Sequence, residues 1–151
     1  MSLQNLFEPG DREALLRRLN GLHPGSARLW GKMGAAQMLA HCAVALEVAC
    51  GDRPKKQALL GRLVTPFIRS SILGEKPFGR NSPTDPDFVI ADERDFNVER
   101  RRLSTIIERF CERGPDAAAT QGHSFFGRLN GDEWGRLMYK HLDHHLRQFG
   151  A

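Results

Sequence analysis

The sequence lacks the features that mark disulfide-rich, zinc-cysteine and secreted proteins. Its three cysteines, Cys42, Cys50 and Cys111, are an odd number and show no spacing typical of a metal site. Each falls in a predicted helix, where cysteine packs as a small hydrophobic residue. No basic segment followed by an apolar run begins the chain, so no secretory signal is predicted. We therefore expect a reduced, cytoplasmic protein.

Long apolar runs and a strong excess of one charge are also missing. The longest apolar stretch, residues 58–74, contains Arg62, Pro66 and Arg69, and it is too short and too charged to span a bilayer. The 22 basic and 18 acidic residues leave a net charge of +4, which we interpret as solubility charge. Residues 100–102 are three arginines that point in different directions around a helix, so specific nucleic-acid binding is not expected.

Helical periodicity is present over most of the chain. At 151 residues the chain is expected to form a single domain, residues 1–151. Amphipathic patterns predict four helices, at residues 11–20, 33–50, 92–113 and 130–149. These segments predict an all-α, up-down four-helix bundle. Residues 54–73 predict an inserted helical element between the second and third bundle helices, which Pro66 should kink or split.

The connections and one unusually apolar helix leave some questions open. Gly114-Pro115 should end the third bundle helix, and the proline-rich residues 74–91 should form a loop. Residues 33–50 are apolar on all sides, so their second face should meet another helix or a partner subunit. The amphipathic residues 54–73 fit a core-covering helix or a membrane-surface helix, and we favour the first. No strand is predicted.

The segment from Asn130 to Phe149 carries the clearest chemical signal. Asn130 and Glu133 form a capping box at its start. A turn of about 100° per residue places His141 and His145 on the core-facing stripe, among Trp134, Leu137, Met138, Gln148 and Phe149. Lys140 and Arg147 fall away from this stripe and are expected to be solubility charge. Buried imidazole nitrogens need partners, and a metal ion is one way to supply them.

A third histidine, His41, is centred on the core-facing side of residues 33–50. Three neutral imidazoles with an open position would bind a borderline divalent metal. The alternative is that these histidines are satisfied by carbonyls, carboxylates or water. Leu142 stands where an HExxH zinc motif requires glutamate, so that motif is absent. Gln37 and Gln148 are candidates for orienting ligands or substrate, although either amide could instead bond only to backbone. His144 lies on the flank of the stripe and is expected beside the site or at the surface, not as a ligand.

Two blocks of sequence indicate a family. MLAHC, with His41, and KHLDHHLRQFG, with His141, His145 and Gln148, resemble the DinB/YfiT-like superfamily of metal-dependent four-helix-bundle proteins. The longer blocks LWGKMGAAQMLAHC and HSFFGRLNGDEWGRLMYKHLDHHLRQFG resemble an uncharacterised, domain-of-unknown-function branch of that superfamily. The chain departs from the pattern in HHLRQ, where many relatives have a His-Arg-Gly-Gln-like run, and in the insertion at 54–73.

The resemblance implies a function and a set of partners. It implies an open three-histidine site, commonly occupied by zinc or nickel, and frequent homodimers. Members with known activity include transferases that use low-molecular-weight thiols and hydrolase-like proteins. We therefore expect a metal-dependent thiol S-transferase or hydrolase that acts on a small-molecule substrate. The alternative is a non-catalytic, metal-binding, dimeric protein of stress response or protein interaction.

Overall fold

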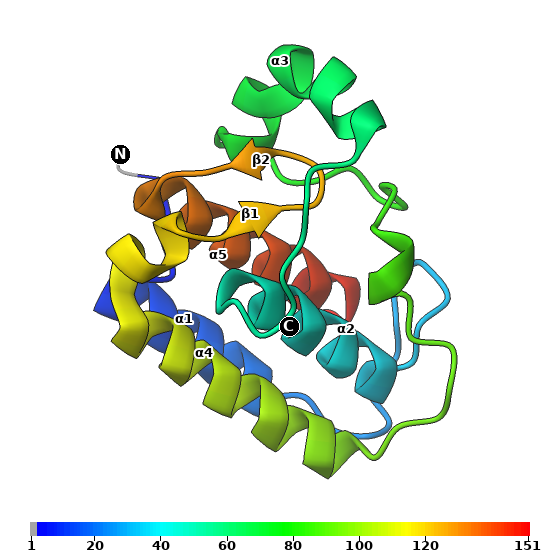
Figure 1. Ribbon diagram of the computed structural model, residues 1–151. Coiled ribbons are helices and arrows are strands. Elements are labelled where there is room, and N and C mark those ends of the chain that lie inside the picture. Colours follow the sequence, from blue (N-terminus) through cyan, green and yellow to red (C-terminus); the bar gives the residue numbers. More distant parts are fainter. Residues whose placement is uncertain (1–2) are drawn as a thin grey trace.

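The computed structural model describes residues 3–151, and most of the backbone is helical (Figure 1). Along these residues run five α-helices: α1 (Pro9–Asn20), α2 (Ala35–Ala49), α3 (Leu59–Leu73), α4 (Phe96–Ala119) and α5 (Gly131–Gln148). A 3-10 turn, η1 (Pro86–Phe88), precedes α4. The short antiparallel strands β1 (Gly122–His123) and β2 (Gly127–Arg128) form a hairpin between α4 and α5. The all-α prediction is confirmed, apart from this unpredicted hairpin.

Helix α2 is the most deeply buried element of the chain. It packs against α4 and α5, and β1 and η1 also lie against it. Small and apolar side chains such as Ala40, Ala43 and Leu46 are almost completely inaccessible. The apolar character of α2 on all sides is therefore explained by contacts within one chain, and covering its second face requires no partner subunit.

Helix α5 is the second central element, and its predicted N-terminal cap is confirmed. Asn130 Oδ1 accepts a hydrogen bond from the Glu133 amide at 2.8 Å, and a Glu133 carboxylate oxygen accepts one from the Asn130 amide at 2.9 Å. Its buried face, which includes Trp134 and Leu146, contacts α1, α2 and α4. The helices α1, α2, α4 and α5 thus enclose the apolar core, while the finer up-down bundle topology stays a prediction.

The end of α4 differs from the prediction. Gly114 does interrupt the helix, since its φ of 78° is left-handed, but another helical turn follows and continues to Ala119. Proline is tolerated in the first turn of a helix, where its missing N–H has no acceptor to satisfy. Pro115 can therefore begin this extra turn directly after the break. The segment 114–129, predicted as a linker, contains this turn and the hairpin.

Helix α3 lies at the edge of the molecule, over the hairpin and away from α1 and α4 (Figure 1). Pro66 lies inside α3 without splitting it, contrary to one of the predicted outcomes. Only Gly61 and Thr65 of this helix are fully buried. The helix therefore covers little of the core, although its apolar pattern suggested that it would. Nowhere in residues 3–151 is a helix long and apolar enough to cross a membrane.

Candidate metal centre

Three histidines from two helices meet where α2 packs against α5. His41 lies midway along α2, and His141 and His145 lie one turn apart on α5. One potential ligand nitrogen of each lies within 4.8 Å of those of the other two. The Nε2 atoms of His41 and His141 are 3.0 Å apart. These three residues, which the sequence singled out, are called the histidine trio below.

Nδ1 of His41, the ring nitrogen that does not face His141, bonds to the loop between α3 and α4. Nδ1 of His41 lies 2.8 Å from the carbonyl oxygen of Phe88, which is buried at the end of η1. A carbonyl oxygen can only accept, so Nδ1 carries the proton and donates it. In the neutral ring the lone pair is then on Nε2, which faces His141. The loop at 74–91 thereby sets the tautomer of a histidine on another element.

The outer nitrogen of His145 is held in the same way by a side chain. Nδ1 of His145 lies 2.8 Å from Oε1 of Gln148, and Nε2 of Gln148 donates to the carbonyl oxygen of Trp30 at 2.9 Å. Because the Trp30 carbonyl must receive an N–H, the amide orientation is determined, and Oε1 accepts from His145. The lone pair of His145 is therefore on Nε2 as well.

A glycine makes room for this arrangement. Gly31 follows Trp30 and has a φ of +79°, a left-handed conformation that side-chain-bearing residues rarely adopt. A Cβ atom at this position would lie 2.4 Å from Nε2 of Gln148. The Trp-Gly pair thus lets the loop before α2 approach the end of α5 closely enough to orient Gln148.

All three rings of the histidine trio are neutral at pH 7. Burial lowers the pKa of His41 and lowers the pKa of His145 to about 3. The pKa of His141 is lowered well below its usual value, first by burial and then by the neighbouring histidines. Removing a proton is therefore not required before these nitrogens can act as ligands.

The donor set fits a divalent metal ion. Metal–nitrogen bonds of about 2.0–2.1 Å in a tetrahedral site separate two ligand nitrogens by about 3.4 Å. This value lies between the 3.0 Å from His41 to His141 and the upper limit of 4.8 Å for the trio. Without a metal ion, Nε2 of His141 could carry a proton and donate a hydrogen bond to Nε2 of His41. That proton cannot also satisfy Nε2 of His145, which receives no hydrogen bond from residues 3–151. A single ion can accept all three lone pairs.

The other predicted candidates lie at different distances from the trio. His144 contacts the ring of His145 and also lies against Trp30 and Phe78, with ring centroids 5.7 and 5.9 Å away. It therefore forms part of the wall beside the trio. Gln37 instead accepts from the Gly34 amide and donates to the Asp92 carbonyl oxygen at the start of α2. Its amide therefore bonds to backbone groups at the N-terminus of α2 and to no histidine.

His123 is a half-buried histidine on the first strand of the hairpin. Its Nδ1 accepts hydrogen bonds from the amides of Phe125 and Phe126, at 3.0 and 3.1 Å, so the ring proton is on Nε2. Burial lowers its pKa to about 4. The ring lies against Trp134, and it is close enough to contribute to the lowered pKa of His141. Only the hairpin, which sequence patterns did not predict, brings it there.

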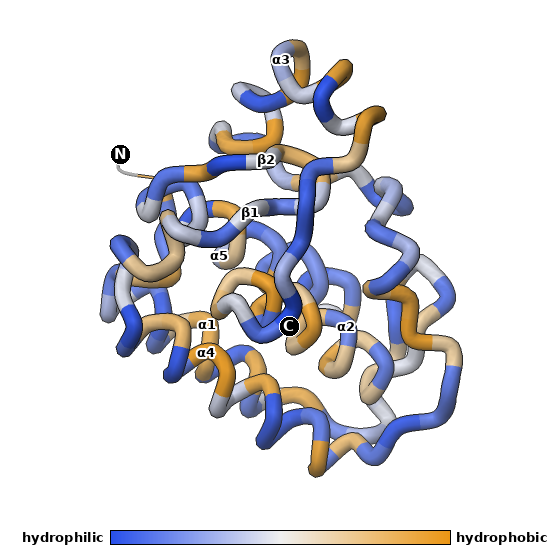
Figure 2. The backbone as a smooth tube through the Cα atoms, viewed as in Figure 1, coloured by the Kyte–Doolittle hydropathy of each residue, from blue (hydrophilic) through white to orange (hydrophobic). Residues whose placement is uncertain are grey.

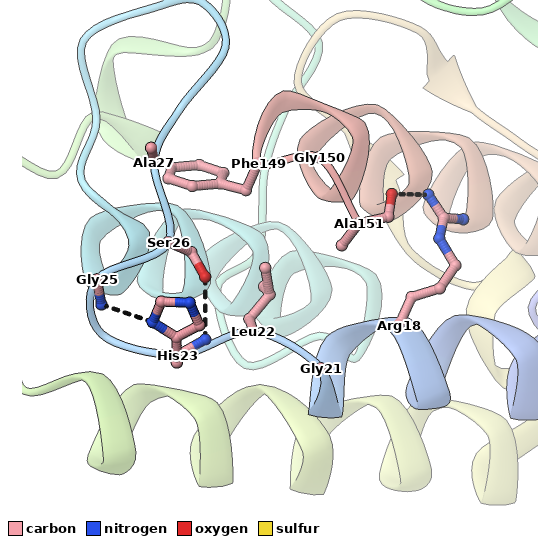
Figure 3. A pocket seen from close by; sticks show the side chains of 10 residues that line it. All are labelled: Arg18, Gly21, Leu22, His23, Gly25, Ser26, Ala27, Phe149, Gly150 and Ala151. Atoms are coloured by element: carbon pink, nitrogen blue, oxygen red, sulfur yellow. Dashed lines mark hydrogen bonds between the residues drawn. The ribbon is translucent and has the colours of Figure 1, made fainter.

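One surface hollow lies away from the trio. This hollow of about 430 Å³ is formed by the loop after α1 and the C-terminal residues (Figure 3). There Arg18 donates to the carbonyl oxygen of Ala151, and the His23 ring accepts from the Gly25 amide. No member of the trio lines this hollow. His141 is the partly exposed member of the trio.

Comparison with protein families matches residues 4–151 to one family, described as "Protein of unknown function (DUF1569)". Searches of curated proteins and of solved structures gave no match. The matched range contains all five helices, the hairpin and the whole histidine trio.

Proposed function

This chain belongs to the DUF1569 family, and from that premise we propose that it is a metal-dependent enzyme whose histidine trio holds one divalent ion. One observation carries the proposal. Nδ1 of His41 and Nδ1 of His145 are both occupied by acceptors, so the lone pairs of both rings are directed to the inside of the cluster with His141. Ligand histidines in metalloproteins are typically oriented in this way.

The proposed ion is zinc or nickel, in keeping with a ligand set of neutral imidazoles. Three protein ligands leave a coordination position open, and an ion held in this way lowers the pKa of a water or thiol bound there. The chain's own residues do the positioning. Phe88 orients His41, and Gln148 orients His145.

Aromatic residues on the His145 side of the trio suggest what kind of substrate fits. His144, Trp30 and Phe78 form an aromatic wall next to the trio. We propose that a small molecule with an apolar part packs there. In a thiol S-transferase, the sulfur of a low-molecular-weight thiol, as thiolate, attacks an electrophilic carbon and displaces its leaving group, while the thiol proton passes to solvent. In a hydrolase, water replaces the thiol as nucleophile.

A non-catalytic, metal-stabilised protein that acts as a homodimer is the second candidate. Two members of the trio are buried, and the hollow at the C-terminus does not reach them. These features favour a structural ion. We also propose that the family falls within the DinB/YfiT-like superfamily, which is supported by the placement of His41 on α2 and of His141 and His145 on the last helix.

Metal analysis of the untagged protein tests the proposal. We expect about one divalent ion per chain, and we expect His41→Ala and His145→Ala to lose it. Gln148→Leu should keep the ligands but weaken binding by about 10–100-fold, because His145 loses its orienting acceptor. His23→Ala changes an exposed loop histidine and serves as the matched control. Full metal content in both trio variants would exclude this site.

Activity assays then separate the candidates. Purified protein would be incubated with several low-molecular-weight thiols and simple electrophiles, before and after removal of the metal. Metal-dependent consumption of thiol indicates S-transfer, and metal-dependent turnover without thiol indicates hydrolysis. A metal-loaded protein with neither activity would favour the structural candidate.

A further inference from the structure

One side of α3 is apolar and faces solvent. Leu59, Leu60, Leu63 and Phe67 are 77, 64, 71 and 83% exposed. At about 100° per residue they fall within one arc of the helix, opposite the buried Gly61 and Thr65. Hydrophobic stretches are visible along α3 in Figure 2, at the edge of the molecule. We call these four residues the apolar face of α3.

Polar contacts on the other side of α3 hold this face outward. Thr65 and Gln57 both donate to the carbonyl oxygen of Phe125, at 3.0 and 2.7 Å. A Cβ at Gly61 would lie 2.3 Å from the same oxygen, so the absence of a side chain allows the helix to approach the hairpin. Arg69 bonds to both carboxylate oxygens of Glu133 on α5 at 2.6 Å. Turning the apolar face inward would break all of these contacts.

The segment that carries this face is strongly basic in sequence, and Arg53, Lys55 and Arg69 within it pair with Glu47, Asp87 and Glu133 outside it. Residues 53–80 contain seven basic residues and one acidic residue, a net charge of +6, whereas the rest of the chain has 15 basic and 17 acidic residues, a net charge of −2. Lys56, Arg62 and Lys76 of this segment are exposed, and within residues 3–151 none of them forms an ion pair. Arg62 lies at the flank of α3, between its apolar and its buried sides.

We propose that α3 docks the protein onto an anionic lipid surface. Leucine and phenylalanine on one side of a helix, flanked by lysine and arginine, are typical of helices that lie in the membrane interface. The cations then meet lipid phosphates, and the apolar face enters the acyl boundary. This binding is peripheral and is independent of the metal proposal.

Two other occupants fit the surface less well. A second copy related by two-fold symmetry would place the same cationic segment on both sides of the contact, where the charges repel. A peptide helix needs a groove to receive it, whereas the apolar face is the outer side of a single helix at the edge of the molecule (Figure 1). A lipid surface requires no such concave shape.

Vesicle co-sedimentation of the full chain tests the proposal. We expect binding to vesicles of phosphatidylglycerol and phosphatidylcholine, and little binding to phosphatidylcholine alone or at high salt. The double variant Leu63→Ser/Phe67→Ser should bind at least about 10-fold more weakly. Lys56→Gln/Arg62→Gln should bind about 30-fold more weakly, or about five-fold per charge. A Phe67→Trp variant should show a blue shift of its emission on binding, which reports insertion.

The control is Val98→Ser, which removes another exposed apolar side chain from α4 and should leave vesicle binding unchanged. Thermal melts of each variant verify that the fold is retained. Absence of binding to anionic vesicles overturns the proposal, as does binding that is unchanged in Leu63→Ser/Phe67→Ser. A dimer that this double variant dissociates, together with no vesicle binding, would assign the face to a second copy.

Discussion

The tautomer of His41, His145 and His123 is decided by what bonds to Nδ1 of each ring. In His41 and His145 the acceptors are the Phe88 carbonyl and the Gln148 amide, so the inner nitrogens keep their lone pairs. His123 has the opposite arrangement, because two backbone amides donate to Nδ1 and leave the proton on Nε2. The same residue type is therefore prepared as a ligand at two positions and as a hydrogen-bond donor at a third.

The lowered pKa of His123 leads to a pH prediction. Its pKa is about 4 in the folded protein and about 6.5 in the unfolded chain, so between these values only the unfolded chain takes up the proton. The stabilisation from this residue is complete above pH 6.5 and is lost as the pH falls toward 4, a change of about 3 kcal/mol. In His123→Asn, Oδ1 can still accept from the backbone amides. We expect its melting temperature to fall less between pH 7 and 4.

Thermal melts across this pH range, with His23→Asn as the exposed control, measure the difference. A slope in His123→Asn equal to that of the unsubstituted protein would show that His123 is not kept neutral by burial.

At the scale of elements, a lysine of α5 caps the C-terminus of α3. Nζ of Lys140 donates to the carbonyl oxygens of Ser71, Ile72 and Gly74, at 3.3, 2.7 and 2.9 Å, where α3 ends. The Ser71 and Ile72 carbonyls belong to the last turn of α3 and have no partner within the helix. Burial lowers the pKa of Lys140. The expectation that this lysine is solubility charge is therefore wrong, since its charge caps another helix.

Removing that charge should loosen α3 and leave the core intact. In Lys140→Met the side chain keeps its length, but the three carbonyls lose their donor, at a cost of about 1–3 kcal/mol. We expect amide hydrogen exchange to become about 10-fold faster or more in residues 59–74 and to stay unchanged in α2. Arg147→Met, on the same helix, removes an exposed charge that pairs with Asp143 and serves as the control. Equal exchange in α3 for both variants would contradict this role.

For the whole molecule, the histidine trio joins segments far apart in the sequence. His41 on α2 bonds to Phe88 in the loop before α4. Gln148 at the end of α5 bonds to Trp30 in the loop before α2. The trio exists only in the folded chain, so the ion would bind the folded chain and not the unfolded one. It would therefore stabilise several elements together.

Metal removal should accordingly lower the melting temperature of the whole domain. With free metal at about 100 times its dissociation constant, the stabilisation is about 2.7 kcal/mol, or about 5–10 °C for a chain of this size. Calorimetry with and without a chelator measures the difference, and His145→Ala should not respond to the chelator. An unchanged melting temperature after verified loss of the ion would show that the ion does not connect these elements.

The sequence by itself determined the features that depend on local periodicity. The core-facing stripe of α5, its Asn130 cap and the shared side of His141 and His145 all follow from helical geometry over a few residues. His41 stood out because it is the one histidine in a mostly apolar helix. The ends of α4 were less predictable, because a proline after Gly114 can either stop a helix or begin another turn.

Only the tertiary structure decided what surrounds these residues. The acceptor for His41 is a backbone carbonyl of Phe88, and every residue type has such a carbonyl, so no sequence pattern reveals it. The outward direction of the apolar face of α3 depends on contacts with Phe125 and Glu133, which are distant in the chain. An amphipathic pattern specifies that a helix has two faces. Packing against the rest of the molecule decides which face is buried.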